Sequence, residues 1–414
     1  MKTQARWNVI ICTMKSFRWI CLLLFISWIG FGCAKKIPLP LWASQISMIP
    51  EPIGSEQILK VPDGDWISFA ELMEGLQEAR VIYAGETHDQ IEHHQIQLRI
   101  LQGLMEKGKE VVVAMEMFQR SQQPVLDRWT SGQLTEEQFL REVDWETTWS
   151  IDYSLYRGIL DEAKNKGLKV LGLNIPKEWV KKIAQNGIEA LSPEDRGRLP
   201  EMDLTDQQHR AYVQSIYGQH RQGLAKTFEY FYQAQCLWDE GMAETLSRFL
   251  QSPEGMGKTI LVLAGGGHVV FDFGIPKRVY RRVSVPYQTI VLREWKKTLD
   301  DDLTFAGATS PPADFLWFTP PPPPEKKRPR IGVTLKIRED PQGIAIERVM
   351  PESPAEKAGL LPGDQFIAVE GKEIKGVKDI HAALDEKGWG KEITFTILRD
   401  GIKKEIIVKL PPAE

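Results

Sequence analysis

The sequence is poor in cysteine, and this scarcity limits the kinds of site that its folded part can hold. Three of the four cysteines (Cys12, Cys21 and Cys33) lie near the N-terminus, and only Cys236 lies beyond them. An internal disulfide is therefore excluded in the body of the chain, as is a zinc or iron–sulfur site built on cysteine. Any metal site there must use histidine, aspartate, glutamate or tyrosine.

Several other signatures are also missing. There is no Cys-x-x-Cys-His motif, which excludes covalent haem attachment, and no Gly-x-Ser-x-Gly motif that would indicate a serine hydrolase. The glycines at 265–267 lack the spacing and the downstream acid of a dinucleotide-binding loop. The formal net charge of −4 is close to balance and no long basic face stands out, so nucleic acid is not an expected partner.

What the sequence does contain begins with the pattern of an export signal at residues 1–33. A short basic stretch precedes a nearly unbroken apolar run at 19–31, which leads to Gly32-Cys33. The run is shorter than the roughly 20 residues that a membrane-spanning helix needs. This order is typical of a secretory signal, and it reads best if translation starts at Met14.

Gly32-Cys33 resembles the bacterial lipobox, in which the cysteine is lipidated and becomes the mature N-terminus. The resemblance implies a protein anchored to the membrane through Cys33. Ala34, in place of aspartate after the cysteine, favours the outer membrane, with the protein facing the periplasm. A plain cleaved signal and an uncleaved anchor are the alternatives.

The length of 414 residues accommodates two domains, and a 42% hydrophobic content is enough for two buried cores. Residues 34–60 are predicted to be a tether and residues 61–310 an α/β domain. Residues 311–329 are predicted to be a linker without the apolar pattern needed to dock on a core. Its unbroken prolines at 320–324 favour a stiff polyproline II spacer. Residues 330–414 form a compact unit of short strands.

Short apolar runs alternate with amphipathic segments in the α/β domain, which predicts a mostly parallel sheet. The runs, which we expect to be buried strands, are 81–84, 111–115, 170–173 and 260–264. The helices expected between them are 91–107, 153–166 and 178–185. Residues 205–251 are rich in Gln, Tyr and His and predict long helices that form a cap over the sheet.

Polar side chains follow each of the four predicted strands. Glu86 and His88 follow the first, Glu116 the second, Asn174 the third and His268 the fourth. In open parallel sheets ligands bind beyond the carboxyl ends of the strands, so these side chains are expected to converge. Two histidines and two carboxylates suit Zn²⁺, Mn²⁺ or Co²⁺, or equally a metal-free acid/base pair. Each could also be a helix cap or a hydrogen-bonded residue at the sheet edge.

His94 has a different setting. On the helix expected at 91–107 it shares a face with Leu98 and Leu101, so it is predicted to be semi-buried against the sheet. A hydrogen-bonded core histidine and a ligand are both open interpretations at this position.

The segment from Tyr83 to His88 resembles the ChaN-like haem-binding family, which belongs to a superfamily with the Tiki and TraB proteins and looks related to erythromycin esterases. Further matches follow in the same order along about residues 60–300. They are His94 and Gln97, Met115–Phe118, Asp144-Trp145 with Trp149 and Tyr156, Leu173–Pro176, Ala234-Gln235, Asp239, Met242-Ala243, Gly267-His268 and Gly274–Pro276.

The resemblance implies a lipoprotein that handles iron or haem, with haem as its cofactor. Ferric haem takes tyrosine or histidine as axial ligand. His94, Asn174, Tyr212 and Tyr217 are the cofactor-binding candidates. Further candidates in the cap are Tyr230, Tyr232, His209 and His220, although a Tyr/His stripe on a helix is also ordinary packing. Tiki relatives imply instead a metal-dependent hydrolase that uses Glu86, His88, Glu116 and His268.

The last 85 residues resemble a bacterial PDZ domain of the kind appended to periplasmic proteases. The matching segments are Arg330–Leu335, Ser353–Leu360, Pro362–Asp364, Val369–Lys372 and Leu398–Gly401. PDZ domains bind extended C-terminal peptides by strand addition. The resemblance implies that backbone N–H groups of Ile331, Gly332 and Val333 receive the peptide carboxylate. A purely structural PDZ domain is the alternative.

Three functions follow from these patterns. The first is an exported lipoprotein that binds haem or a metal cofactor and docks a partner peptide through its PDZ domain. The second is a Tiki-like metal-dependent hydrolase or peptidase, and the third is an adaptor whose α/β site has lost activity. A homodimer is left open.

Overall fold

The structure is a computed structural model that describes residues 56–217, 225–295, 310–321, 329–339, 342–374 and 376–413. The chain divides into two compact units, Met1–Pro321 and Pro322–Glu414. The predicted export signal with Cys33, as well as His220, lies outside the described residues. Within the described ranges, no helix has both the length and the apolar composition that a membrane crossing needs.

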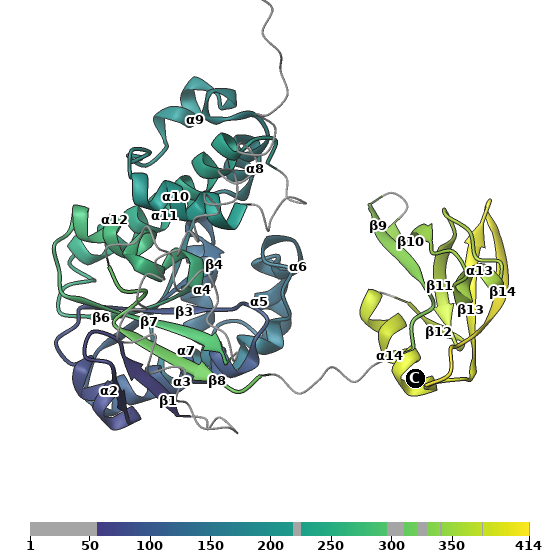
Figure 1. The fold of residues 1–414 in the computed structure, drawn as a ribbon, viewed down its shortest axis with the longest axis horizontal. Helices are drawn as coiled ribbons and strands as arrows, with labels where there is room; N and C mark the ends of the chain where they lie inside the picture. Colours follow the sequence, from purple (N-terminus) through teal and green to yellow (C-terminus); the bar gives the residue numbers. More distant parts are fainter. Residues whose placement is uncertain are drawn as a thin grey trace, which may run out of the picture. The chain divides into compact units, whose positions relative to one another are not determined.

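An eight-stranded sheet forms the centre of the first unit, with the order β2-β1-β8-β7-β3-β6-β4-β5 (Figure 1). The strands from β8 to β5 are parallel, whereas β1 pairs antiparallel with β8 and β2. Their bounds are β1 (Gln57–Lys60), β2 (Asp65–Ile67), β3 (Val81–Glu86), β4 (Val111–Gln119), β5 (Val170–Asn174), β6 (Thr259–Gly265), β7 (Tyr287–Glu294) and β8 (Phe315–Thr319). The four predicted strands, β3 to β6, are therefore neighbours whose carboxyl ends meet at one edge.

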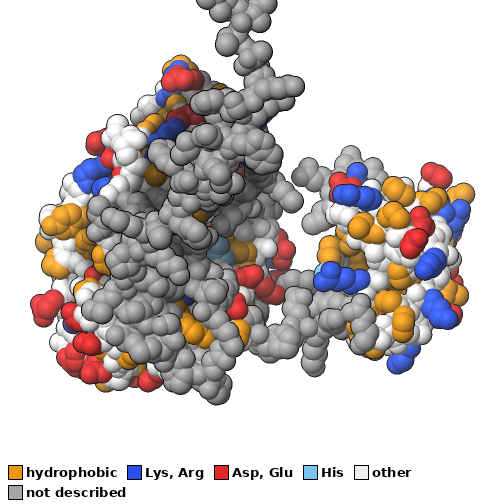
Figure 2. Space-filling view, in the orientation of Figure 1, with side chains coloured by type: hydrophobic (Ala, Val, Ile, Leu, Met, Phe, Trp, Pro, Cys, Tyr) orange, Lys and Arg blue, Asp and Glu red, His pale blue; other side chains and the backbone are white. Residues whose placement is uncertain are grey.

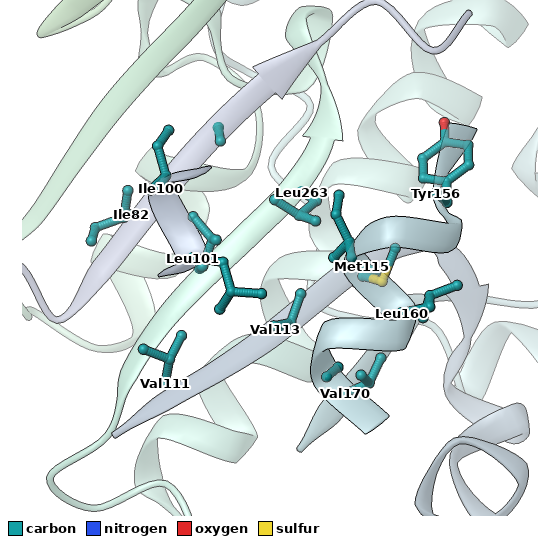
Figure 3. Packing of buried hydrophobic residues seen from close by; sticks show 14 of the residues in the cluster. Ile82, Ile100, Leu101, Val111, Val113, Met115, Tyr156, Leu160, Val170 and Leu263 are labelled. Carbon is teal, nitrogen blue, oxygen red and sulfur yellow. The ribbon is translucent and has the colours of Figure 1, made fainter. Parts of the chain in front are cut away.

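Helices cover both faces of this sheet, which explains the unbroken apolar runs of its strands. In β3, Val81 and Tyr83 belong to one hydrophobic core, whereas Ile82 and Ala84 belong to the other. Figure 3 shows part of the second core, with Leu263 from β6 among its side chains.

The core that contains Ile82 is closed by the helices of the first half of the unit, and the core that contains Val81 by the later helices. The first group comprises α2 (Phe69–Gly75), α3 (Ile91–Glu106), α4 (Gln123–Thr130), α5 (Glu136–Glu142), α6 (Trp145–Thr148) and α7 (Arg157–Lys166). The second comprises α10 (Gln207–Tyr217), α11 (Phe228–Gln251) and α12 (Ile275–Arg282). A smaller core joins α11 to α8 (Lys177–Asn186), which is followed by α9 (Pro193–Gly197). The predicted α/β architecture is thus confirmed.

Two predicted connecting segments prove too long. Strand β1 occupies the end of the predicted tether, and β8 lies in the predicted linker. All five residues of β8 are buried, and its first residue is preceded by Asp314, which accepts hydrogen bonds from the backbone and hydroxyl of Thr289. The prediction that this linker could not dock on a core is therefore wrong, because its short apolar run completes the sheet beside β7.

The second unit is a small, β-rich domain, as predicted. Its strands have the order β14-β13-β11-β10-β9, with β12 paired to β11, so that β9 lies at an edge. The elements are β9 (Val333–Glu339), β10 (Gln342–Val349), α13 (Pro354–Lys357), β11 (Gln365–Val369), β12 (Lys372–Glu373), α14 (Val377–Lys387), β13 (Glu392–Arg399) and β14 (Ile402–Lys409). Figure 2 shows charges of both signs mixed with apolar side chains on the visible face of this unit.

One acidic side chain in the first unit is poorly accommodated. Asp272, after β6, has a left-handed backbone with φ of 62° and accepts a hydrogen bond from the Tyr287 hydroxyl at 3.3 Å. Its Oδ1 atom is buried and has no hydrogen-bond partner among the described residues. Burial and the nearby charge of Asp314 raise the pKa of Asp272 to about 6.

Replacing Asp272 by asparagine is therefore expected to stabilise the unit at neutral pH, by about 1–2 kcal/mol. A raised carboxyl pKa means that the folded state binds the proton more tightly, so wild-type stability falls as the pH rises from about 4 to about 6. Asparagine carries no charge and tolerates a positive φ. Thermal unfolding of both proteins at about pH 7 and about pH 4 measures this effect. An advantage of the variant that does not shrink at the lower pH would contradict it.

Candidate functional site

A cavity of about 260 Å³ lies at the carboxyl edge of the parallel strands. The residues that line it are His88, Glu116, Met117, Gln119, Thr148, Trp149, Asn174, Ile175, Lys177, Trp238 and His268. Four of the residues predicted at strand ends are thus brought together around one cavity: His88, Glu116, Asn174 and His268.

His88 is held at the cavity wall by the last residue of β3. Its Nδ1–H donates to Glu86 Oε1 at 2.9 Å, and the edge of the ring packs against Trp149 with centroids 4.9 Å apart. The His88 side chain remains 34% exposed. Its Nε2 atom has no hydrogen-bond partner among the described residues. Burial opposes protonation of this ring, but Glu86 and Glu116 raise its pKa, so Nε2 offers a lone pair to a ligand once the ring has lost its second proton.

Glu86 supports His88 from behind and does not itself line the cavity. Its Oε1 also accepts a hydrogen bond from the Tyr156 hydroxyl at 2.9 Å, and Nδ1 of His94 lies 3.2 Å from Oε2. Burial opposes ionisation of Glu86, but the contacts with His88 and His94 outweigh it and lower the pKa to about 2. Glu86 is therefore a permanent carboxylate that fixes the orientation of the His88 ring.

Glu116 and His268 form a second pair of a carboxylate and a histidine in the cavity wall. Glu116 Oε2 accepts the backbone N–H of Gly265 at 2.8 Å, and Glu116 Oε1 lies 3.5 Å from His268 Nε2. His268 Nδ1 lies 2.6 Å from Oδ1 of Asp239 on α11. Burial disfavours the charged ring, but Glu116 and Asp239 together raise the pKa of His268 to about 10. The raised pKa favours the protonated ring, in which both nitrogens are donors.

The glycine run that follows β6 allows these two pairs to approach each other. A Cβ atom on Gly265 would lie 2.9 Å from His88 Cε1 and 3.7 Å from Glu116 Oε2. The first of these distances is shorter than carbon atoms tolerate, so Gly265 permits the close approach of His88 to the backbone. Gly265 is therefore a point where a histidine ring packs directly on the backbone.

Asn174 has a mainly structural part in the cavity wall. Its Nδ2 donates to the backbone carbonyl of Glu116 at 3.1 Å, and its Oδ1 accepts the backbone N–H of Ile175 at 2.9 Å. These bonds tie the ends of β4 and β5 together. Asn174 therefore positions Glu116 and has few free polar groups for a cofactor.

Other predicted cofactor residues lie away from the cavity. His94 is 2% exposed and lies behind Glu86, as expected of a histidine that faces the sheet. Tyr212 is 2% exposed in the core beneath α10, and Tyr217 packs on Phe228 and Phe231. Neither tyrosine lines the cavity, because the inner face of the cap is used to close the hydrophobic core. The remaining cap candidates among the described residues, Tyr230, Tyr232 and His209, do not line it either.

The four residues predicted to bind a divalent ion are not arranged as a set of metal ligands. Among the described residues, no group of three or more His, Cys, Asp or Glu side chains is arranged to hold a metal ion. Glu86 faces inward, towards His88, His94 and Tyr156, and does not line the cavity. The divalent-metal alternative therefore has no support in this geometry.

The sequence pattern missed several residues of the wall. Trp238 and Lys177 line the cavity, and Asp239 holds His268. Asp239 and Trp149 were marked by the family resemblance without a role, whereas nothing in the pattern distinguished Trp238 or Lys177 from ordinary helix residues.

Comparisons with known proteins give two family matches. A family model described as "Haem-binding uptake, Tiki superfamily, ChaN" matches residues 72–279, half of the chain. A PDZ domain model matches residues 329–410. A solved structure described as cofacial heme binding to ChaN of Campylobacter jejuni is 20% identical and covers 63% of this chain and 94% of its own, with a TM-score of 0.49.

Curated relatives match a short part of the chain. A probable periplasmic serine protease do/HhoA-like protein of Haemophilus influenzae is 44% identical over 69 residues, 17% of this chain and 15% of its own length. A putative zinc metalloprotease of Mesorhizobium japonicum is 39% identical over 67 residues, 16% of this chain and 17% of its own length. The chain thus spans less than a fifth of the length of these relatives.

Proposed function

Because the chain belongs to the ChaN family of haem-binding uptake proteins, within the Tiki superfamily, we propose that the cavity at the carboxyl edge of its sheet binds haem with His88 as the axial ligand. The observation that carries this proposal is the orientation of His88. Histidines that bind metals usually donate their other ring N–H to a carboxylate, as His88 does to Glu86 at 2.9 Å. The lone pair of Nε2 is left for iron.

The chemistry of the cavity wall suits part of a haem. Trp149 and Trp238 offer flat apolar surfaces, and Lys177 offers a cation for a propionate. A cavity of about 260 Å³ is smaller than the usual pocket for a drug-sized ligand, so a haem would project from its open side. His88 would hold the iron, and bound haem would supply redox and ligand-exchange chemistry that the axial ligand and the polarity of the pocket control.

His268 is not the axial ligand in this proposal. Both of its nitrogens face carboxylates, so iron at either nitrogen would have to displace the contact with Asp239 or with Glu116. Titration of the full chain with hemin tests the proposal. We expect a Soret band that saturates at one haem per chain. A spectrum identical to that of free hemin would exclude it.

A second candidate function is a hydrolase that needs no metal, since the cavity holds a histidine base beside a histidine acid. His88 is oriented by Glu86 as a base would be, and protonated His268 is a donor in the same cavity. Turnover of simple chromogenic esters that is lost in a His88→Asn variant, in protein free of haem and treated with chelator, would favour this candidate over haem binding.

We further propose that the chain is exported and anchored through a lipid on Cys33, with a role in iron or haem handling. The support is the order of basic, apolar and Gly-Cys segments at the N-terminus. Mass spectrometry of the mature protein is expected to show an acylated N-terminal Cys33. An intact thiol at this residue would contradict the anchor.

The PDZ domain is proposed to bind the C-terminus of a partner protein along β9. This strand lies at the edge of its sheet, so its free backbone groups can pair with an added strand. The loop before it turns at Gly332, which has φ of 79° and whose Cβ would lie 2.4 Å from Ser353 Cβ.

Replacing Gly332 by alanine is therefore expected to displace the loop at 331–333 and weaken peptide binding by roughly tenfold or more. The probe is a random C-terminal peptide library, followed by titration of a selected peptide. Gly371→Ala is the matched control, because Gly371 has a similar φ of 75° and open space at its Cβ position. Equal affinities of the two variants would contradict the proposed role of the loop.

A further inference from the structure

A row of buried ionisable side chains continues behind His268, away from the cavity. It consists of Asp239 and Glu240 on α11, His209 on α10 and Arg278 on α12, and none of the four is more than 3% exposed. None of them lines the cavity. Each buried charge costs several kcal/mol unless a partner compensates it. The contacts among these four side chains therefore decide how each of them is oriented.

The direction of the hydrogen bonds is set at Arg278. Its Nη2 lies 3.3 Å from Nδ1 of His209. A guanidinium has donors and no acceptors, so His209 Nδ1 must accept. Burial lowers the pKa of His209 to about 4, with the Arg278 charge acting in the same direction, and the neutral ring carries its one proton on Nε2. That nitrogen faces Asp239 Oδ2 at 3.6 Å, which is beyond hydrogen-bond distance, and Oδ2 has no hydrogen-bond partner among the described residues. The opposite charges of Arg278 and Asp239 attract each other, and against the effect of burial this raises the pKa of Arg278.

Arg278 itself is fixed on several sides. Its Nη1 donates to the backbone carbonyls of Phe273 and Gly274, and its Nε lies 3.2 Å from Glu240 Oε1. Glu240 is in turn paired with Arg281 and Arg282 at the outer face of α12. The guanidinium therefore cannot turn away from His209 without breaking these contacts.

Asp239 transmits this arrangement to the cavity. Its two oxygens face His209 and His268, and the shorter contact, 2.6 Å, is to His268 Nδ1. The other nitrogen of His268, Nε2, is 3.5 Å from Glu116 Oε1, which is longer than a normal hydrogen bond. This N–H therefore makes no full hydrogen bond to Glu116 and can donate to an oxygen atom of a ligand in the cavity.

We propose that His209 and Arg278 are positioning residues that hold Asp239 against His268, so that His268 faces the cavity as a hydrogen-bond donor to an acceptor oxygen of the ligand. Nε2 of His88, which has no partner among the described residues, is then the nitrogen left for iron, and the two histidines have different tasks. This inference rests on the proposed haem site for the identity of the ligand. The arrangement of the protons does not depend on that ligand.

The first test uses the haem-free full chain labelled with ¹⁵N at histidine. Two-bond ¹⁵N–¹H spectra at neutral pH should show His209 protonated on Nε2 alone and His268 protonated on both nitrogens. A proton on Nδ1 of His209 would overturn the proposal. Because no ligand is present, this result stands even if the chain does not bind hemin.

The second test uses variants. His209→Leu should change the ¹⁵N shifts of His268 and weaken hemin binding roughly tenfold, because the N–H dipole that faces Asp239 Oδ2 is lost. His209→Gln should restore both, since its amide can accept from Arg278 and donate to Asp239. Tyr232→Phe is the matched control, because Tyr232 packs on the His209 ring with centroids 5.5 Å apart but has no contact with Asp239 among those described.

Two outcomes of the variant test are decisive. Unchanged His268 shifts in His209→Leu would overturn the positioning role, as would a His209→Gln protein that behaves like the leucine variant. If hemin fails to bind to the wild type, the proposed function falls, but the shifts of His268 still decide whether His209 positions it.

Discussion

Replacing His88 by alanine is expected to lower the affinity for hemin by at least about a hundredfold, because the variant loses the nitrogen that binds iron. The fold should persist, since the His88 side chain is 34% exposed and its one side-chain hydrogen bond is to Glu86. Absorbance titration in the Soret region gives the affinity of each protein. Thermal unfolding of the haem-free variant should remain cooperative, with a lower midpoint than wild type, because the buried Glu86 carboxylate loses its hydrogen bond from His88.

The matched control is His381→Ala, which removes an exposed histidine from α14 of the PDZ domain. It should leave the Soret titration unchanged. His268→Asn should weaken binding but keep the spectrum of a histidine-ligated haem, since both nitrogens of His268 face carboxylates. If His268→Asn loses the Soret band and His88→Ala keeps it, the assignment of the axial ligand is wrong.

Replacing Glu86 by glutamine is expected to destabilise the haem-free α/β unit by roughly 2–4 kcal/mol at neutral pH. The change removes a fully buried carboxylate that His88, His94 and Tyr156 share. Glutamine has one acceptor oxygen in place of two, and it carries no negative charge. His88 and His94, whose pKa values Glu86 raises against the effect of burial, then lose the charge that favours their protonated forms.

The stabilising effect of the Glu86 carboxylate is expected to depend on pH. The pKa of Glu86 is lowered to about 2 from an ordinary 4.5, so its contribution is complete above about pH 4.5 and is lost as the pH falls towards 2. Chemical denaturation at several pH values should therefore show the gap between wild type and variant closing in acid. Tyr156→Phe is the comparison, since it keeps the carboxylate and removes only one donor to it, at a cost of roughly 1.5 kcal/mol at neutral pH. A constant gap for Glu86→Gln would contradict the role of the charge.

Much of the fold could be predicted from local pattern. The apolar runs that became β3 to β6 are buried on both faces, and such strands are apolar without alternation. The ChaN and PDZ resemblances were predicted from ordered short motifs and are confirmed by the family matches. Strands β1 and β8 were missed, because short apolar stretches next to proline-rich segments give no signal of the long-range pairing that buries them.

The candidate site, like the fold, could be predicted only in part. His88, Glu116, Asn174 and His268 could be placed together from sequence, because parallel strands bring their carboxyl ends to one edge whatever the details of packing. The separate chemical role of each residue could not be predicted from the sequence. Glu86 and Glu116 are alike in sequence, but one faces inward to three donors and the other lines the cavity.

What the sequence by itself determined is therefore the kind of fold, the edge that carries polar chemistry and the family, since these depend on the order of residues along the chain. Tertiary structure alone decided which groups are charged. His88 and His268 both follow strands, yet His268 lies between the carboxylates of Asp239 and Glu116, whereas His88 bonds to Glu86 and its Nε2 has no partner among the described residues. Protonation depends on burial and on partners distant in sequence, which no local pattern records.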